Sequence, residues 1–241
     1  NPALSLLEKV VESQAKLVAK WVLIGFVHGV MNTDNMAISG ETIDYGPCAF
    51  LDEYHTEKVF SSIDWQGRYA YGHQWQAAQW NLTRLAETLL TQIDSKRYKA
   101  IEMATEVVES FSEQFQCYWL SGMRQKIGLG QEMEGDEEHI IDLLGAMQEN
   151  ALDFTMTFRA LSSHLDIDGD DNYTRSAIAS WQEKDQWLQR WLERLEKESK
   201  PLSEIAQEMN RVNPLYIPRN HQIEAIIKVA TEEGNYQPMY E

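Results

Sequence analysis

Apolar residues recur at three- and four-residue steps through most of the chain, a spacing typical of helices that bury one face. The first run predicts a helix over about residues 3–24, whose apolar face consists of Leu4, Leu7, Val11, Ala15, Val18 and Val22. Further helices are predicted over about 76–92, 95–127, 136–149, 152–163, 174–199, 202–211 and 220–233. Strand patterns are scarce outside one short segment near residue 40. The chain is therefore expected to be mainly α.

Residues 45–75 break this pattern and read as an irregular segment rich in aromatic residues. Its aromatic residues include Phe50, Tyr54, Phe60, Trp65, Tyr69, Tyr71 and Trp75. Long loops of this kind are packed, functional or both.

The most informative segment is residues 28–46, which read HGVMNTDNMAISGETIDYG. Ser39-Gly40 is a two-residue hairpin signal, because glycine accepts a positive φ. That turn would place Met36 opposite Ile43 and Asn35 opposite Asp44, and directly opposed side chains have Cβ atoms about 4.5–5.5 Å apart. An amide and a carboxylate placed in this way can hold one hard divalent cation, with phosphates and water in its other positions.

The structural alternative is that Asn35 and Asp44 serve only as turn or capping residues, since Asn and Asp both favour such positions. Their spacing across the predicted hairpin, together with the flanking His28 and Gly46, favours the metal site. The segment also resembles the metal-binding layout of protein kinases, His-Arg-Asp-Leu-x-x-x-Asn followed by Asp-Phe-Gly.

One position departs from that kinase layout. Val30 stands where a kinase carries its base aspartate, and an apolar side chain cannot accept a hydroxyl proton. The nearest candidate base is Asp34, although it could also serve only to orient the loop through hydrogen bonds. His28 is expected to be structural, packed beneath the Asp44-Tyr45-Gly46 turn.

With this substitution, the segments HGVMNTDN, TIDYGPCAFLD, GRYAYGHQ, WNLTRLAETL, DFTMTFRALS and NPLYIPRNH resemble the selenoprotein O family of kinase-like protein adenylyltransferases. The resemblance covers nearly the whole chain. It implies a kinase-like C-lobe with a small catalytic-loop β-hairpin over residues 1–130, and a helical C-terminal extension over 131–241.

The resemblance also implies a reaction, in which AMP passes from ATP to Ser, Thr or Tyr hydroxyls of proteins. Asp34 then corresponds to the proton acceptor. Asn35 and Asp44 correspond to ligands of magnesium, or manganese, and Asp44 also lies beside the nucleotide phosphates. The expected cofactor and partners are a divalent cation, ATP and protein substrates.

The family's N-lobe, with its glycine-rich loop, lysine–glutamate pair and phosphate-binding arginines, is expected upstream of Asn1, and the 241 residues alone are expected to be inactive. Two alternatives stay open. One is a non-catalytic, kinase-like helical scaffold. The other, weaker one is a kinase that transfers the γ-phosphate.

Composition narrows the classes of partner. The net charge is −17, with a pI near 4.7, which disfavours nucleic acid as a general partner. No stretch approaches the roughly 20 apolar residues that span a bilayer, and no signal-peptide pattern follows Asn1. A cytoplasmic protein with reduced thiols at Cys48 and Cys117 is expected, and a disulfide between them is the alternative.

Other conspicuous residues receive structural interpretations. The acidic segment 165–172 fails as an EF-hand, because Asp171 replaces the glycine and Ala177 the glutamate that the calcium loop requires. The residues interpreted as packing or structural by default are Trp181, Trp187, Trp191, Arg68, Tyr69 and Arg159. The spacing of the histidines does not suggest a zinc site.

Overall fold

A computed structural model describes residues 1–166 and 172–240, which are mainly helical as the periodicity predicts. The helices are α1 (Pro2–Leu23), α2 (Gln74–Ile93), α3 (Arg97–Lys126), α4 (Asp136–Glu149), α5 (Phe154–Leu165), α6 (Asn172–Ser176), α7 (Lys184–Leu195), α8 (Leu202–Val212) and α9 (Asn220–Glu233). The short elements are strands β1 (Phe26–Val27) and β2 (Ala49–Phe50) and the 3-10 helices η1 (Thr33–Asn35), η2 (Tyr71–His73) and η3 (Gln237–Met239). All but one of the predicted helices match to within about two residues at each end, the usual uncertainty of a helix boundary.

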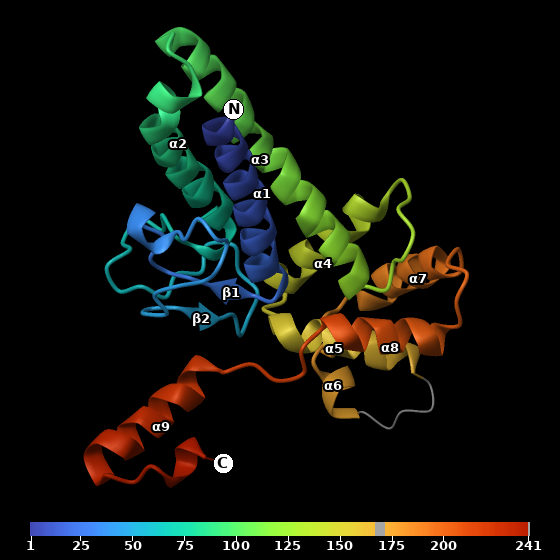
Figure 1. The fold of residues 1–241 in the computed structure, drawn as a ribbon. Helices are drawn as coiled ribbons and strands as arrows, with labels where there is room; N and C mark the ends of the chain where they lie inside the picture. The colour runs from blue at the N-terminus through green and yellow to red at the C-terminus, as the bar shows by residue number, and fades with distance from the viewer. Residues whose placement is uncertain (167–171, 241) are drawn as a thin grey trace.

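The three long helices α1, α2 and α3 pack against one another as a bundle (Figure 1). α1 buries the face that its apolar spacing predicts, with Val11, Ala15 and Val18 fully buried. Each buried Val or Leu side chain contributes about 1.5–3 kcal/mol. The helix begins at Asn1, whose side chain accepts hydrogen bonds from two backbone N–H groups of the first turn.

α1 ends at a position that requires glycine. Gly25 has a φ of +73°, and an added Cβ would lie 2.8 Å from Cδ1 of Phe154. The chain turns there into β1, which pairs antiparallel with β2 so that Phe26 lies opposite Phe50. This two-stranded sheet closes the loop of residues 28–48.

A second core lies among α4, α5, α7 and α8 and the adjoining ends of α1 and α3. Trp181, Trp187 and Trp191 are all buried in it, and the rings of Trp187 and Trp191 stack with their centres 5.6 Å apart. The indole N–H of Trp191 donates to the carbonyl of Ile127 (2.8 Å). The packing role predicted for these tryptophans is confirmed.

The single helix predicted over about 174–199 is wrong. α6 ends at Ser176, α7 begins at Lys184, and turns connect them. Ile178 and Trp181 are buried within these turns, where the N–H of Trp181 donates to the carbonyl of Ile178 (3.2 Å). Short turns bury the same apolar residues that suggested a helix, so tertiary packing outweighs local propensity here.

α9 lies apart from the rest of the molecule in Figure 1, and none of its residues, all of them described, is buried. The segment before it is attached through Arg219, whose guanidinium contacts Asp52 and also Asp153 (2.6 Å). Hydrogen bonding to Asp153, and then to Asp52, raises the pKa of Arg219. The attachment is therefore at the start of α9, while its length is exposed.

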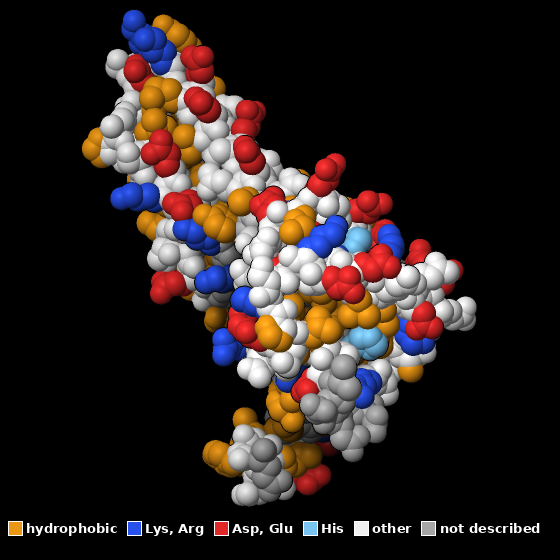
Figure 2. Space-filling view, turned by 90° about the vertical axis from the view of Figure 1, so that its right-hand side faces the viewer, with side chains coloured by type: hydrophobic (Ala, Val, Ile, Leu, Met, Phe, Trp, Pro, Cys, Tyr) orange, Lys and Arg blue, Asp and Glu red, His pale blue; other side chains and the backbone are white. Residues whose placement is uncertain are grey.

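Acidic side chains extend over the whole face shown in Figure 2, with Lys and Arg scattered among them. This distribution follows from the net charge of −17 and favours partners other than phosphate backbones. In residues 1–166 and 172–240, every helix is too short or too polar to cross a membrane.

Lys126, at the end of α3, is buried in the second core. Lys126 is 3% exposed, its Nζ lies 3.9 Å from the centre of the Phe158 ring, and it donates to Oδ1 of Asn213 (2.8 Å). Burial lowers the pKa of Lys126 from 10.5 to about 7. The folded protein therefore holds this amine at a free-energy penalty at neutral pH.

Replacing Lys126 with methionine is expected to stabilise the protein at neutral pH. The unfolded chain binds a proton at this amine between pH 7 and 10.5 that the folded chain does not bind. The free-energy penalty for burying the charged amine is therefore largest below pH 7, and it decreases as the pH rises to 10.5. Lys126→Met should raise the free energy of unfolding by about 1–3 kcal/mol at neutral pH, after loss of the bond to Asn213.

Urea unfolding between about pH 6 and pH 10 measures this effect, and the gain should shrink toward the alkaline end. Lys99→Met is the matched control, since Lys99 is an exposed lysine of the same helix. A gain for Lys126→Met that is the same at every pH would show that burial does not penalise the charge.

Candidate active site

The loop of residues 28–48 brings Asn35 and Asp44 into contact. Nδ2 of Asn35 donates to Oδ2 of Asp44 (2.8 Å) and to the carbonyl of Val30 (3.1 Å). Because the nitrogen makes both bonds, Oδ1 of Asn35 remains available as an oxygen ligand. The sequence predicts this meeting of an amide and a carboxylate, whereas the binding of a cation by the pair stays a prediction.

The predicted hairpin register is wrong by one residue. Met36 pairs with Thr42 rather than Ile43, in an isolated bridge. The chain reverses through a turn in which the N–H of Gly40 donates to the carbonyl of Ala37 (3.0 Å). Gly40 has a φ of +77°, and an added Cβ would lie 2.9 Å from Cβ of a serine of α1. The turn is therefore set by its packing on α1 as well as by its own residues.

Asn35 and Asp44 meet although neither residue lies in a strand. Asn35 ends η1, and Asp44 has a φ of +54°, a left-handed conformation that aspartate tolerates better than most residues. Such outliers concentrate at functional sites. At Gly46 an added Cβ would lie 3.3 Å from Oδ1 of Asp44, so glycine leaves room for the carboxylate.

His28 supports this loop from the buried side. Its Nδ1 accepts from the N–H of Val30 (3.3 Å), and its Nε2 lies 2.8 Å from the carbonyl oxygen of Ile43. Since Nδ1 accepts, the ring proton is on Nε2 and is donated to Ile43. The backbone N–H of His28 donates to Oε1 of Gln74, in the first turn of α2 (2.9 Å). His28 thus positions the residue before Asp44, consistent with its predicted structural role.

Asp34 precedes Asn35 in η1 and is exposed to solvent. Among the described residues, no hydrogen bond to its carboxylate is found. The loop beside it is held by Asn32, whose Oδ1 accepts from the hydroxyl of Tyr69 (2.8 Å). The carboxylate of Asp34 is therefore open to an incoming group next to the Asn35–Asp44 pair.

The loop offers few metal ligands, so it suits a cation that binds only one or two protein side chains. In the described part of the chain, no three His, Cys, Asp or Glu side chains gather to hold a metal. Asn35 and Asp44 offer one amide oxygen and one carboxylate, a set that magnesium accepts when nucleotide phosphates and water complete its shell. The pair fits a nucleotide-bound divalent cation.

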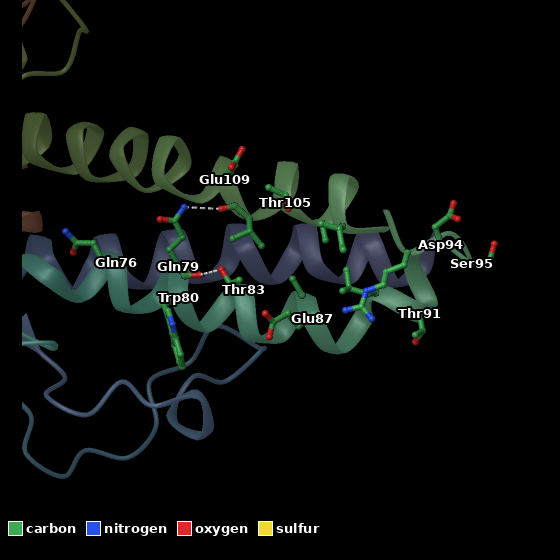
Figure 3. Close-up of a pocket in the computed structure, with 16 residues that line it drawn as sticks. Gln76, Gln79, Trp80, Thr83, Glu87, Thr91, Asp94, Ser95, Thr105 and Glu109 are labelled. Atoms are coloured by element: carbon green, nitrogen blue, oxygen red, sulfur yellow. Dashed lines mark hydrogen bonds between the residues drawn. The ribbon is translucent and has the colours of Figure 1, made fainter. Parts of the chain in front are cut away.

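A groove of about 940 Å³ lies elsewhere, between α2 and α3 (Figure 3). Polar groups along it have partners within the bundle: Nε2 of Gln79 donates to the carbonyl of Val108 (3.4 Å), and the hydroxyl of Thr83 donates to the carbonyl of Gln79 (3.0 Å). None of its lining residues belongs to the loop of residues 28–48, so the candidate chemistry does not depend on this groove.

Other residues singled out in the sequence have simpler surroundings. Arg159 donates to the carbonyl of Asn213 (3.2 Å), a structural contact.

Cys48 and Cys117 are free thiols, and burial raises the pKa of Cys48. Asp168, Asp170 and Asp171, which belong to the predicted acidic loop, lie outside the described residues.

Comparison with known proteins identifies the family. A family model described as "Protein adenylyltransferase SelO" matches residues 1–241. The chain belongs to the SelO family. This result confirms the resemblance seen in the sequence motifs.

SelO-family relatives named "Protein nucleotidyltransferase YdiU" match along the whole chain. The Rhizobium etli (strain CIAT 652) protein is 50% identical over 239 residues, covering 98% of this chain and 47% of the relative. The Agrobacterium fabrum protein is 51% identical over 240 residues (100% and 49%), and the Geobacillus kaustophilus protein 50% over 239 (99% and 48%). The chain spans about half the length of the curated relatives it matches.

The structure of this SelO-family chain also groups three residues that sequence reasoning did not connect. The guanidinium of Arg68 lies 4.6 Å from the ring centre of Trp80, and that of Arg84 lies 5.1 Å from the same ring. Trp80 and Arg84 are four residues apart on α2, a spacing that indicates a shared helix face. Arg68 comes from the aromatic loop, and no spacing rule links it to a helix.

Proposed function

We propose that the chain is the kinase-like half of a protein adenylyltransferase that transfers AMP from ATP to Ser, Thr or Tyr hydroxyls of proteins. The contact between Asn35 and Asp44 beside Asp34, in a chain of the SelO family, carries this proposal. Val30, in the position of the kinase base, favours this reaction over transfer of the γ-phosphate.

Each residue has a distinct role in this reaction. Asp34 accepts the proton of the attacking hydroxyl, whose oxygen bonds to the α-phosphorus while the bond to the bridging oxygen breaks and pyrophosphate leaves. Asn35 and Asp44 would hold Mg²⁺, or Mn²⁺, and Asp44 would lie beside the phosphates. The bound cation would neutralise phosphate charge. His28 orients the loop without touching the substrate.

We place the kinase-like lobe at residues 1–130 and the helical extension at residues 131–241. One core draws its residues from α1, α2, α3 and the intervening loop, and the other joins the end of that lobe to the extension. The glycine-rich loop and the lysine–glutamate pair would then lie in the half of the relatives that this chain does not match. With an incomplete cleft, the 241 residues alone are expected to be inactive.

Two labelled forms of ATP test the proposal. When the full-length protein is incubated with a protein substrate, label from the α-phosphate should appear on protein, while label from the γ-phosphate should leave in pyrophosphate. Label from the γ position alone would establish kinase chemistry. No protein label from either form, under conditions where ATP is shown to bind, would favour a non-catalytic helical scaffold.

A further inference from the structure

A depression of about 460 Å³ lies beside the candidate active site. Its lining joins α1, the loop of residues 28–48 and α2, and includes Gln14, Thr33, Trp80, Asn81 and Arg84. Figure 3 shows Trp80 projecting from α2 away from α3. Thr33 belongs to η1, which also carries Asp34 and Asn35, so the depression borders the candidate active site.

Three residues lining this depression contain buried polar atoms that lack a partner. They are Oε1 of Gln14, Oδ1 of Asn81 and Nε of Arg84, and none of them has a hydrogen-bond partner in the described part of the chain. Gln14 and Asn81 are only 1% and 5% exposed. Leaving a buried polar atom without a hydrogen-bond partner typically costs about 1–3 kcal/mol of folding free energy. The described residues alone therefore do not satisfy the hydrogen bonding of this site.

The orientations of both amides are fixed by their nitrogens. Nε2 of Gln14 donates to the carbonyl of Ala37 (2.6 Å), and Nδ2 of Asn81 donates to the carbonyl of Met31 (2.8 Å). Exchanging N and O in either amide would set two oxygens against each other. The two free oxygens are therefore acceptors without a donor among the described residues, and they stay covered until the side chains of the lining shift.

Arg84 lines the depression, and Arg68, which is not itself a lining residue, reaches its wall through Trp80, in a chain whose net charge is −17. Arg68 and Arg84 both stack on the ring of Trp80, and stacking holds a guanidinium in place while its N–H edge stays available. Arg84 pairs with Glu87 (2.9 Å), but their side chains are 41% and 53% exposed, and such surface pairs are weak. A carboxylate can displace that pairing at the terminal N–H groups of Arg84, whereas its Nε–H is buried.

We propose that this depression binds the acceptor segment of the protein substrate, a polar stretch of chain with an acidic side chain close to the modified hydroxyl. A polypeptide supplies the N–H donors that Gln14 and Asn81 require and the carboxylate that Arg68 and Arg84 attract. A phosphate group offers only acceptors and would leave both amide oxygens unpaired. This inference rests on the proposed function, and it specifies which protein segments the proposed adenylyltransferase would prefer.

The test uses short fluorescent peptides with a central serine flanked by aspartates, or by asparagines or lysines in the same positions. The full-length protein should bind the aspartate peptide about tenfold more tightly than the asparagine peptide, the equivalent of one charge-assisted hydrogen bond. Fluorescence polarisation measures binding, and α-labelled ATP measures kcat/KM for transfer to the same peptides.

Three variants sharpen the test. Arg84→Gln should abolish the preference for aspartate, and Arg84→Glu should shift it to the lysine peptide. Thr88→Trp, at an exposed residue of the lining, should weaken binding of all three peptides because it fills the depression. Arg190→Gln is the matched control, since Arg190 is also half exposed in an ion pair, with Asp142 (2.8 Å), and it should keep the wild-type preference.

Equal binding of the three peptides by the wild-type protein, or a preference that survives Arg84→Gln, would overturn this inference. So would a structure in which ordered waters pair the three atoms while the aspartate peptide binds elsewhere. If α-label reaches protein without an acidic preference, this inference alone fails. If the aspartate peptide binds through Arg84 but no α-label is transferred, only the proposed function fails.

Discussion

Replacing Asp44 with alanine is expected to reduce AMP transfer by the full-length protein by about 1,000-fold or more. The substitution removes the carboxylate that accepts from Asn35, so a cation would keep one protein ligand beside the phosphates. Asp44→Asn is the conservative companion, since asparagine tolerates the φ of +54° and keeps one oxygen. It should reduce transfer by about 100-fold. Initial rates with α-labelled ATP measure both.

Glu41→Gln is the matched control for this prediction. Glu41 is an exposed carboxylate of the same loop, and it accepts from the hydroxyl of Ser39 (2.7 Å), whereas Asn35 donates to Asp44. Its loss should leave the rate within about twofold, because an exposed charge is strongly screened. If Asp44→Ala and Glu41→Gln slowed transfer equally, the Asn35–Asp44 pair would have no special part in the reaction.

Replacing Asp136 with alanine is expected to lower the free energy of unfolding by about 3–5 kcal/mol, because it breaks a buried ion pair. The Asp136 side chain is 0% exposed and contacts Nε of Arg194 (2.7 Å) and Nε of Arg124 (3.2 Å). It also accepts from the backbone N–H of Met133 (2.9 Å). Without it, two largely buried guanidiniums that join α3, α4 and α7 lose their shared partner.

Asp142→Ala provides the comparison within the same helix. Asp142 pairs with Arg190 at 2.8 Å, but the side chains are 39% and 48% exposed, so its loss should cost less than about 1 kcal/mol. Urea midpoints, with the slope of the transition checked for constancy, measure both variants. Similar midpoints for the two would show that burial adds nothing to the ion pair of Asp136.

Sequence periodicity predicts α1 because burial of a single helix face leaves a direct trace in residue spacing. The same rule fails at residues 174–199, where turns bury Ile178 and Trp181 as effectively as a helix would. Periodicity records which residues are buried, and it does not distinguish between two backbones that bury them equally well.

The sequence predicts that Asn35 and Asp44 meet, but it does not predict the backbone geometry that brings them together. Asn35 and Asp44 meet, but through η1 and a left-handed Asp44, because the turn packs on α1 in a register that the local pattern does not encode. The pairing of Arg68 with Trp80 depends on how the aromatic loop folds against α2. Contacts between distant segments of this kind leave no spacing signal in a single sequence.

The most direct measurement is a crystal structure of the full-length protein with Mn²⁺ and a non-hydrolysable ATP analogue, in which anomalous scattering locates the metal. We expect one ion coordinated by Oδ1 of Asn35 and the carboxylate of Asp44, at about 2.0–2.2 Å, and in contact with the phosphates. A nucleotide-bound ion with no ligand from Asn35 or Asp44 would contradict the proposed active site.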